Sequence, residues 1–353
     1  MTERDAGMTT HAPRARDIGA ATSRLVPPDG DTAAREGAAV ERPRCSVIVP
    51  SYASAGTIRS CLAALLKQDA PFFFEIIVVD SSQDETPAIV RREFPQVQLI
   101  HLGERAGPET ARNRGAEQAR GEILAFIDSD CMAQPDWLRR LVARVEEGYD
   151  AIGGATANGN GETLVSWAGY ICEFREFLPG GAVRPMGYLS PNTVAYPRDV
   201  FWSAGGFPRG YYPMEDQIFH QPLRERGARI ALDPEIVVAH MHRTERGQFF
   251  QHQRRLGLAN VRVLRVLGGR GGALARSPLV AMLIMPALVP YRFLRMIVPS
   301  LAIERGLVAR RPQLAWLCFL GMCWWARGFI EGSRLPSDTI EDETWQRTSP
   351  TSS

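Results

Sequence analysis

Two carboxylates one residue apart, Asp128 and Asp130, are the residues of this chain best placed to do chemistry. They follow residues 123–127, an apolar run with the composition of a buried strand. Alternate residues of an extended segment point to one side, so both carboxylates can face one site at the edge of a sheet. Carboxylate oxygens suit Mg²⁺ or Mn²⁺, and such ions take substrate phosphates as further ligands. The spacing therefore predicts a cation that holds a diphosphate, although a lone Asp-x-Asp is more often a turn.

A second acidic pair, Glu215 and Asp216, follows the aromatic-rich loop 210–214 and begins a helical segment that runs to Arg226. A carboxylate can act as a general base that takes a proton from an attacking hydroxyl group. Acids in the first turn of a helix are also favoured by the helix dipole, so a structural role fits the same pattern. Both interpretations stay open from the pair alone.

The composition argues against several other classes of protein. Lys and Arg number 41 against 39 Asp and Glu, so there is no basic excess of the kind that nucleic-acid binding needs. None of the six Cys has Cys-x-x-Cys spacing, which argues against a zinc site and fits a reducing cytoplasm. The first residues lack the continuous apolar segment of a secretory signal. We therefore expect a cytoplasmic protein with no nucleic-acid partner.

The elements that must position the acids follow from two alternating patterns. Short β-branched runs predict strands, and apolar residues three and four apart predict helices between them. Strands are expected at 45–50, 75–80, 97–101 and 122–127, and helices at 57–68, 86–94 and 109–120. This order predicts an α/β fold with a mainly parallel sheet covered by helices on both faces. Ligands bind at the carboxyl ends of such strands, where Pro50, Asp80 and Asp128 fall.

The second half of the chain continues the sheet and then becomes helical, apolar and basic. Strands are expected at 229–232 and 236–240. Residues 278–303 and 314–330 are strongly apolar, but neither is an uninterrupted run of the ~20 residues that a bilayer crossing needs. Paired tryptophans and flanking arginines are typical of a membrane interface. We expect residues 258–332 to associate with a membrane, either across it or on its surface.

The two ends of the chain are polar. Residues 1–44 and 333–353 offer too little apolar surface to offset the entropy of ordering, so both are expected to be disordered tails. For the first tail, a misassigned start codon is the alternative.

Several motifs, in the same order along the chain, resemble those of the family 2 glycosyltransferases. They are Ser46–Tyr52, Val78–Thr86, Gly107–Gly115, Asp128–Asp130, Arg198–Phe207 and Glu215–Asp216. Each motif is weak alone, and their number and order make the resemblance specific. It implies the GT-A fold, a Rossmann-like, mixed and mainly parallel sheet sandwiched by helices, in a catalytic domain at 45–257.

The resemblance also implies a nucleotide-binding side of the site. In the family, the loop matching Pro50, Ser51 and Tyr52 lines the base, and the acid matching Asp80 binds the base or the ribose. The commoner family pattern has a second acid directly after it, where this chain has a serine. The segment 107–115 begins a helix whose N-terminus favours anions, and Arg112 is expected to contact the donor phosphate or neighbouring acids.

The metal and the base are implied in the same way. The family uses Asp-x-Asp for Mg²⁺ or Mn²⁺ and the diphosphate, with the last Asp as the usual ligand. Asp130 is therefore expected to bind the metal, and Asp128 to contact the ribose or lie behind the metal ligands. A histidine completes the metal shell in related enzymes, and alternation puts His240 and His242 on one face. Of the two, His242 is preferred.

For the acid pair, the resemblance implies that Asp216 is the catalytic base and that Glu215 supports it or binds the acceptor. The sequence thus predicts a metal-dependent inverting glycosyltransferase. It would move a sugar from a nucleotide-diphosphate sugar to a hydroxyl acceptor, lipid-linked or an envelope polysaccharide, at the cytoplasmic face of the inner membrane.

Two alternatives stay open. A sugar nucleotidyltransferase would carry a Gly-rich, basic loop after the first strand, where residues 50–56 are poor in basic groups. A catalytically silent, membrane-bound sugar-nucleotide binding module would lack the acids of the catalytic site.

Overall fold

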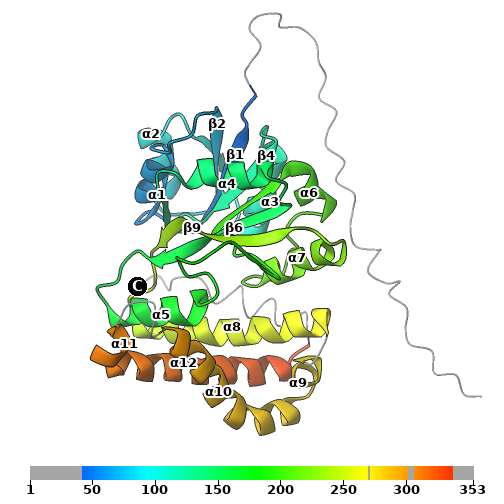
Figure 1. The fold of residues 1–353 in the computed structure, drawn as a ribbon. Helices are drawn as coiled ribbons and strands as arrows, with labels where there is room; N and C mark the ends of the chain where they lie inside the picture. The colour runs from blue at the N-terminus through cyan, green and yellow to red at the C-terminus, as the bar shows by residue number, and fades with distance from the viewer. Residues whose placement is uncertain (1–41, 269–270, 301–305, 337–353) are drawn as a thin grey trace, which may run out of the picture. The chain divides into compact units, whose positions relative to one another are not determined.

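The structure, a computed structural model, describes residues 42–268, 271–300 and 306–336. Most of the two predicted tails, 1–41 and 337–353, lies outside the described residues. The described residues contain one nine-stranded sheet and the helices that surround it (Figure 1). The strands are β1 (Cys45–Ser51), β2 (Phe74–Asp80), β3 (Gln98–His101), β4 (Ile123–Ile127), β5 (Cys131–Ala133), β6 (Ala151–Asn158), β7 (Arg184–Pro185), β8 (Thr193–Pro197) and β9 (Ile230–His240).

The helices follow the strands in the alternation that the sequence predicts over its first half. They are α1 (Ile58–Leu65), α2 (Thr86–Glu93), α3 (Pro108–Gln118), α4 (Trp137–Glu146), α5 (Leu164–Phe174), α6 (Arg198–Ser203), α7 (Glu215–Glu225), α8 (Arg246–Leu267), α9 (Gly272–Arg276), α10 (Pro278–Ser300), α11 (Leu307–Arg310) and α12 (Pro312–Arg334).

The sheet is mixed, with the order β3-β2-β1-β4-β8-β6-β9-β5, and β7 pairs with β9. Strands β3, β2, β1 and β4 are parallel, so their carboxyl ends meet at one edge. Beyond β4 the pairs β4–β8 and β6–β8 are antiparallel, and β6–β9 is parallel again. The prediction of an α/β, mixed sheet between helices is confirmed, with fewer parallel pairs than the first half of the sequence suggests.

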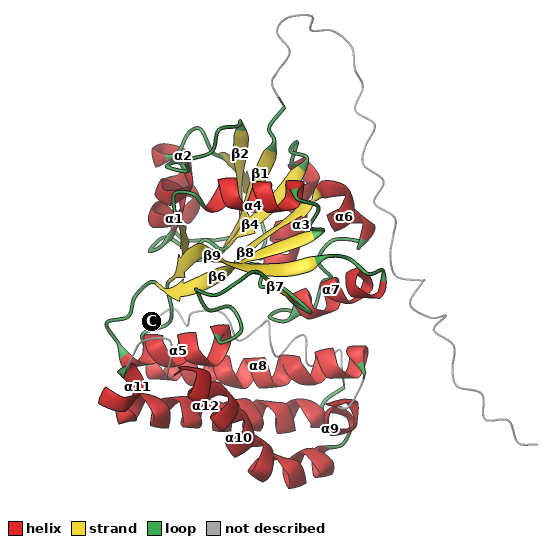
Figure 2. Cartoon of the chain, viewed as in Figure 1, coloured by secondary structure: helices red, strands yellow, loops and turns green. Residues whose placement is uncertain are grey.

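Both faces of the sheet are buried, which explains why its first strands are continuously apolar. Ile48 and Val79 belong to one core cluster, together with residues of α3, α5 and α6. Their neighbours Val47 and Val78 belong to the other cluster, with residues of α1, α2 and α4. Figure 2 shows the strands between these two sets of helices.

Two strands differ from their predicted bounds. β1 continues past Pro50 to Ser51, paired with β2. Its pairing with β4 already ends at Ile48, so the missing proline N–H interrupts no ladder on that side. The two predicted strands at 229–232 and 236–240 are one strand, β9, whose register against β6 shifts between Gly154 and Ala155. An irregular strand of this kind is hard to predict, because the pattern of apolar residues changes face at the shift.

The C-terminal helices pack on one another rather than standing apart. α12 contacts α8, α5 and α10 along its length, and its Leu314, Cys318 and Phe329 are buried. Gly257 of α8 and Gly328 of α12 lie against the backbone of the opposite helix, where an added Cβ would collide with a carbonyl. The predicted boundary at residue 257 falls inside α8.

Candidate functional site

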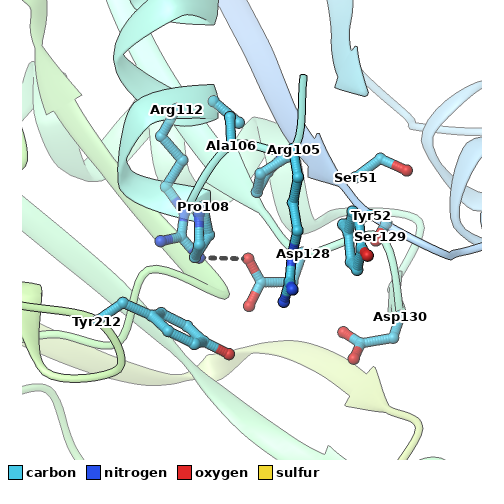
Figure 3. A pocket seen from close by; sticks show the side chains of 12 residues that line it. Ser51, Tyr52, Arg105, Ala106, Pro108, Arg112, Asp128, Ser129, Asp130 and Tyr212 are labelled. Atoms are coloured by element: carbon cyan, nitrogen blue, oxygen red, sulfur yellow. Dashed lines mark hydrogen bonds and ion pairs between the residues drawn. The ribbon is translucent and has the colours of Figure 1, made fainter. Parts of the chain in front are cut away.

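A cleft of about 200 Å³ lies at the carboxyl ends of β1 and β4, next to the start of α3 (Figure 3). It is lined by Pro50, Ser51, Tyr52, Arg105, Ala106, Pro108, Ala111, Arg112, Asp128, Ser129, Asp130 and Tyr212. The parallel pairing of β1 with β4 brings the loops after both strands to this edge. A hydrogen bond of 2.8 Å between the hydroxyls of Ser54 and Ser129 joins the two loops. Ligand sites at this edge are typical of such sheets.

Arg112 connects the two acidic pairs of the sequence. One guanidinium nitrogen, Nη2, donates to Asp128 Oδ1 at 2.6 Å, and the other, Nη1, donates to Glu215 Oε1 at 2.7 Å (Figure 3 shows the first contact). The residue is 3% exposed. Burial lowers the pKa of Arg112, but the charges of Asp128 and Glu215 raise it above its ordinary value. The sequence leaves open whether Arg112 contacts the donor phosphate or neighbouring acids, and in the structure it contacts the acids.

Glu215 and Asp216 begin α7 and are 3% and 8% exposed. Burial raises the pKa of Glu215, and the charge of Arg112 offsets part of this effect. Burial and the adjacent charge of Glu215 raise the pKa of Asp216 well above its ordinary value. His220 supports the same turn, because its Nδ1 lies 2.8 Å from the backbone oxygen of Asp216. Asp216 does not line the cleft and is connected to it through Glu215 and Arg112.

A third buried acid, Glu109, belongs to this group and was not predicted as a site residue. It lies in the first turn of α3, one turn before Arg112, and is 6% exposed. Burial and the charge of Glu215 raise its pKa to about 7. Its Oε2 is buried without a hydrogen-bond partner among the described residues. Its sequence signal is only an acid at a helix start, which gives no hint of this burial.

The residues able to hold a cation lie at the other end of the cleft. Asp130 Oδ2 is 3.5 Å from His240 Nε2, and the ligand atoms of Asp130, Cys131 and His240 lie within 4.8 Å of one another. Burial raises the pKa of the Cys131 thiol well above its ordinary value, which disfavours the thiolate that binds metals. The ring of His242 is tilted by 49° against that of His240, with ring centroids 4.4 Å apart, but His242 is not part of this group. The geometry thus favours His240 over the predicted His242.

Only some of the expected nucleotide-binding residues lie at the cleft. Pro50, Ser51 and Tyr52 line the cleft, and the guanidinium of Arg105 lies 4.6 Å from the centre of the Tyr52 ring. Asp80 is fully buried behind them. Its two oxygens accept hydrogen bonds from the Ser82 backbone and hydroxyl at 3.0 and 2.7 Å. In this arrangement Asp80 shapes the loop after β2 instead of facing the cleft.

Residues 46–202 match the family model described as glycosyl transferase family 2. A glycosyltransferase of Haloferax volcanii, AglE, is 28% identical over 291 residues, which are 79% of this chain and 93% of that protein. The succinoglycan biosynthesis protein ExoO of Rhizobium meliloti is 39% identical over 105 residues, 30% of each chain. The longer match extends over most of the chain, and the shorter one is local.

Among solved structures, the fold is similar to that of a mannosyltransferase from Pyrobaculum calidifontis, PcManGT, in complex with GDP-Man and Mn²⁺. The TM-score is 0.50 at 21% identity, over 80% of this chain and 86% of that one. A mixed α/β sheet between helices, with its cleft at the carboxyl ends of parallel strands, is the GT-A fold that the sequence motifs imply. Residues 46–202 are a family 2 glycosyltransferase domain, and the protein is a glycosyltransferase.

Proposed function

We propose that this protein is a metal-dependent, inverting glycosyltransferase that moves a sugar from a nucleotide-diphosphate sugar to a hydroxyl group of an acceptor. The observation that carries the proposal is that Arg112 lies between two acidic groups, one at the cleft and one buried. Asp130 faces the cleft beside His240, and Glu215 and Asp216 are buried on the other side of Arg112. One group suits a cation and a diphosphate, and the other suits proton transfer.

The donor set beside the cleft fits Mg²⁺ or Mn²⁺. Asp130 offers carboxylate oxygens on a side chain that is 40% exposed, and His240 offers an imidazole. Carboxylates suit both ions, and imidazole suits transition metals, so the pair favours Mn²⁺. We assign Asp130 and His240 as ligands, with His242 behind them. The bound cation would stabilise negative charge on the departing nucleoside diphosphate.

The chain's own residues perform the rest of the step. Asp216 takes the proton of the acceptor hydroxyl while that oxygen forms a bond to the anomeric carbon. The bond from the anomeric carbon to the diphosphate breaks, and the nucleoside diphosphate leaves with the electron pair. A raised pKa makes Asp216 a stronger base, provided that it is ionised before the acceptor binds. Arg112 orients Asp128 and Glu215 and compensates their charges.

On the nucleotide side, Tyr52 with Arg105 supplies a flat surface for a base, and Ser51 supplies a hydroxyl at the end of β1. Asp80 is proposed to affect binding of the ribose or base indirectly, because it holds the loop after β2 in place. The acceptor is proposed to be a glycan or a lipid-linked glycan, which agrees with the name of the succinoglycan relative. The proposed location is the cytoplasmic face of the inner membrane, and the six free cysteines of the described residues fit the reducing cytoplasm on that side.

The membrane is proposed as a partner because α10 is long and apolar enough to cross one, by length and composition. No second helix of that kind occurs among the described residues. The family assignment favours sugar transfer over nucleotidyl transfer and over a silent binding module.

The proposal is tested with purified protein and a panel of UDP-, GDP- and dTDP-sugars, with Mn²⁺, with Mg²⁺ and with EDTA. The expected result is release of the nucleoside diphosphate from one donor, dependent on the cation, with inverted anomeric configuration in the product by NMR. Consumption of a nucleoside triphosphate and a sugar 1-phosphate would establish nucleotidyl transfer instead. Binding without any turnover would support the silent module.

A further inference from the structure

Helix α10 carries a continuous apolar surface on the side that faces away from the protein. We name this surface the outer stripe and define it by Leu279, Leu283, Tyr291, Leu294 and Val298, which are 56–80% exposed. Their spacing of three, four, seven and eight residues places them on one side of the helix. A surface helix of a globular protein presents charged and polar residues there instead. An exposed apolar surface of this kind is typical of a site that contacts a protein or a membrane.

The opposite side of α10 is also apolar, and it is covered. Met285, Val289, Met296 and Ile297 are buried, and the helix packs on α12. In Figures 1 and 2, α10 lies on the side of α12 away from the sheet. A helix that crossed a bilayer would have to leave this contact and uncover α12. One covered side and one uncovered side fit a helix that lies along a lipid surface.

The arginine that interrupts the apolar sequence does not interrupt the outer stripe. The guanidinium of Arg292 lies 4.1 Å from the centre of the Trp325 ring of α12, so this side chain is turned toward the protein. The other charged residue of α10, Arg295, is exposed near its C-terminal end. Trp316 of α12 is 61% exposed and stacks on Phe319, which in turn contacts Phe293 of α10.

The charge around α10 is complementary to an anionic surface. The described residues between 271 and 336 contain seven arginines and a single acid, Glu331. That acid is paired with Arg254 and Arg327. Arg276, Arg310 and Arg311 are exposed around α10 and α11. Arginines at the level of the headgroups hold an apolar helix on anionic lipid.

We propose that the outer stripe of α10 is inserted into one leaflet of an anionic lipid membrane, with the helix parallel to the membrane plane and the protein on one side only. This inference rests on the proposed membrane partner and decides how the partner is bound. Sugar transfer and membrane insertion use different residues, so each can fail without the other.

The full chain is first tested for binding to vesicles of phosphatidylcholine with and without a quarter of phosphatidylglycerol, by sedimentation. Binding is expected to the anionic vesicles and to weaken at high salt. The double variant Leu283→Gln, Leu294→Gln should bind about tenfold or more weakly, because it removes two exposed leucines without adding charge. Val266→Gln, at a side chain that is 48% exposed on α8, is the matched control and should bind normally.

The orientation is tested with nitroxide labels on cysteines introduced as Leu279→Cys, Leu283→Cys and Leu294→Cys, with the unsubstituted chain as the background. A helix parallel to the membrane places all three labels at a similar depth. A depth that changes steadily along the helix would establish a crossing and overturn the proposal. It would also be overturned if the full chain bound no vesicles, or if the outer stripe proved to join two copies, seen as a dimer in analytical ultracentrifugation that Leu283→Gln, Leu294→Gln dissociates.

Discussion

The two acidic pairs of the site, Asp128 with Asp130 and Glu215 with Asp216, are all carboxylates but lie in very different surroundings. The side chain of Asp130 is 40% exposed at the cleft, whereas Glu215 and Asp216 are buried at the start of α7. The open pair is available to a cation and a phosphate that arrive from solvent. The buried pair has raised pKa values and depends on Arg112 for compensation. The two pairs thus differ in burial more than in chemistry, and under the proposed function this difference separates metal binding from proton acceptance.

The largest expected effects come from removing one acid of each pair. Asp216→Asn and Asp130→Asn should each lower turnover about 10³-fold, since a general base and a metal ligand each contribute on that scale. Their Mn²⁺ dependence should differ. Asp130→Asn weakens Mn²⁺ binding, and Asp216→Asn leaves Mn²⁺-dependent binding of nucleoside diphosphate unchanged in calorimetry.

Asp69→Asn, at a side chain that is 77% exposed, is the control and should behave as wild type. Near-normal turnover by Asp216→Asn would show that another group takes the proton. Equal loss of Mn²⁺ binding in both variants would contradict the division of tasks between the two pairs.

The next effect concerns the arginine between the pairs. Arg112→Met should lower the free energy of unfolding by about 3–5 kcal/mol, because it leaves Glu215 buried without its charge partner. Urea denaturation followed by circular dichroism measures this value. Arg114→Met on the same helix, at a side chain that is 55% exposed, should change it by less than about 0.5 kcal/mol. Similar losses in both variants would mean that the ion pairs of Arg112 contribute no more than a surface contact.

A pH-dependent effect follows from Glu109, whose pKa is raised to about 7 in the folded protein. The folded state holds this proton more tightly than the unfolded state, so the residue destabilises the fold progressively as the pH rises from about 4.5 to about 7. Glu109→Gln should remove this destabilisation, which reaches about 3 kcal/mol. The free energy of unfolding of the variant should therefore exceed that of wild type by an amount that grows between pH 5 and pH 8.

The measurement is a series of urea titrations across that pH range. Glu117→Gln, on the same helix and paired with the exposed Arg114, is the control and should show no growing advantage. A constant difference between Glu109→Gln and wild type at all pH values would mean that Glu109 does not titrate there.

The smallest effect lies on the open side of the site. Ala53, in the loop after β1, has a φ of 51°, in the left-handed region that residues with a Cβ rarely adopt. Ala53→Gly should raise the free energy of unfolding by about 0.5–1 kcal/mol, since relief of this strain outweighs the added freedom of the unfolded chain. Ala55→Gly in the same loop lacks a positive φ and should be neutral or destabilising. A loss of stability in Ala53→Gly would show that the conformation costs little.

The sequence predicts the first half of the fold well, because strands β1 to β4 and their helices follow two clear periodicities. It also brings Pro50, Tyr52, Asp128 and Asp130 to one edge, since the carboxyl ends of parallel strands meet there. The partners of Arg112 could not be predicted in the same way. Glu215 is 103 residues away in sequence, and only the tertiary fold brings it to Arg112.

The choice between His240 and His242 shows a different limit. Alternation along β9 puts both on one face, so the pattern cannot decide which of them reaches Asp130. The decision depends on the pairing of β5 with β9, in which Cys131 lies opposite His240. The same holds for α12, whose apolar residues fit a membrane segment as well as a packed helix. Its contacts with α8 depend on glycines that have no apolar signal.

The glycine contact between α8 and α12 has a consequence for the integrity of the enzyme. Gly257 and Gly328 let the backbones of α8 and α12 touch, and Glu173 of α5 accepts a hydrogen bond from Gln253 of α8 at 3.2 Å. The C-terminal helices therefore pack directly on one another and on α5. A polypeptide that ended after residue 257 would lack half of α8 and all of α12. The enzyme is therefore expected to unfold in a single cooperative transition, in which the C-terminal helices and the sheet with its cleft are lost together.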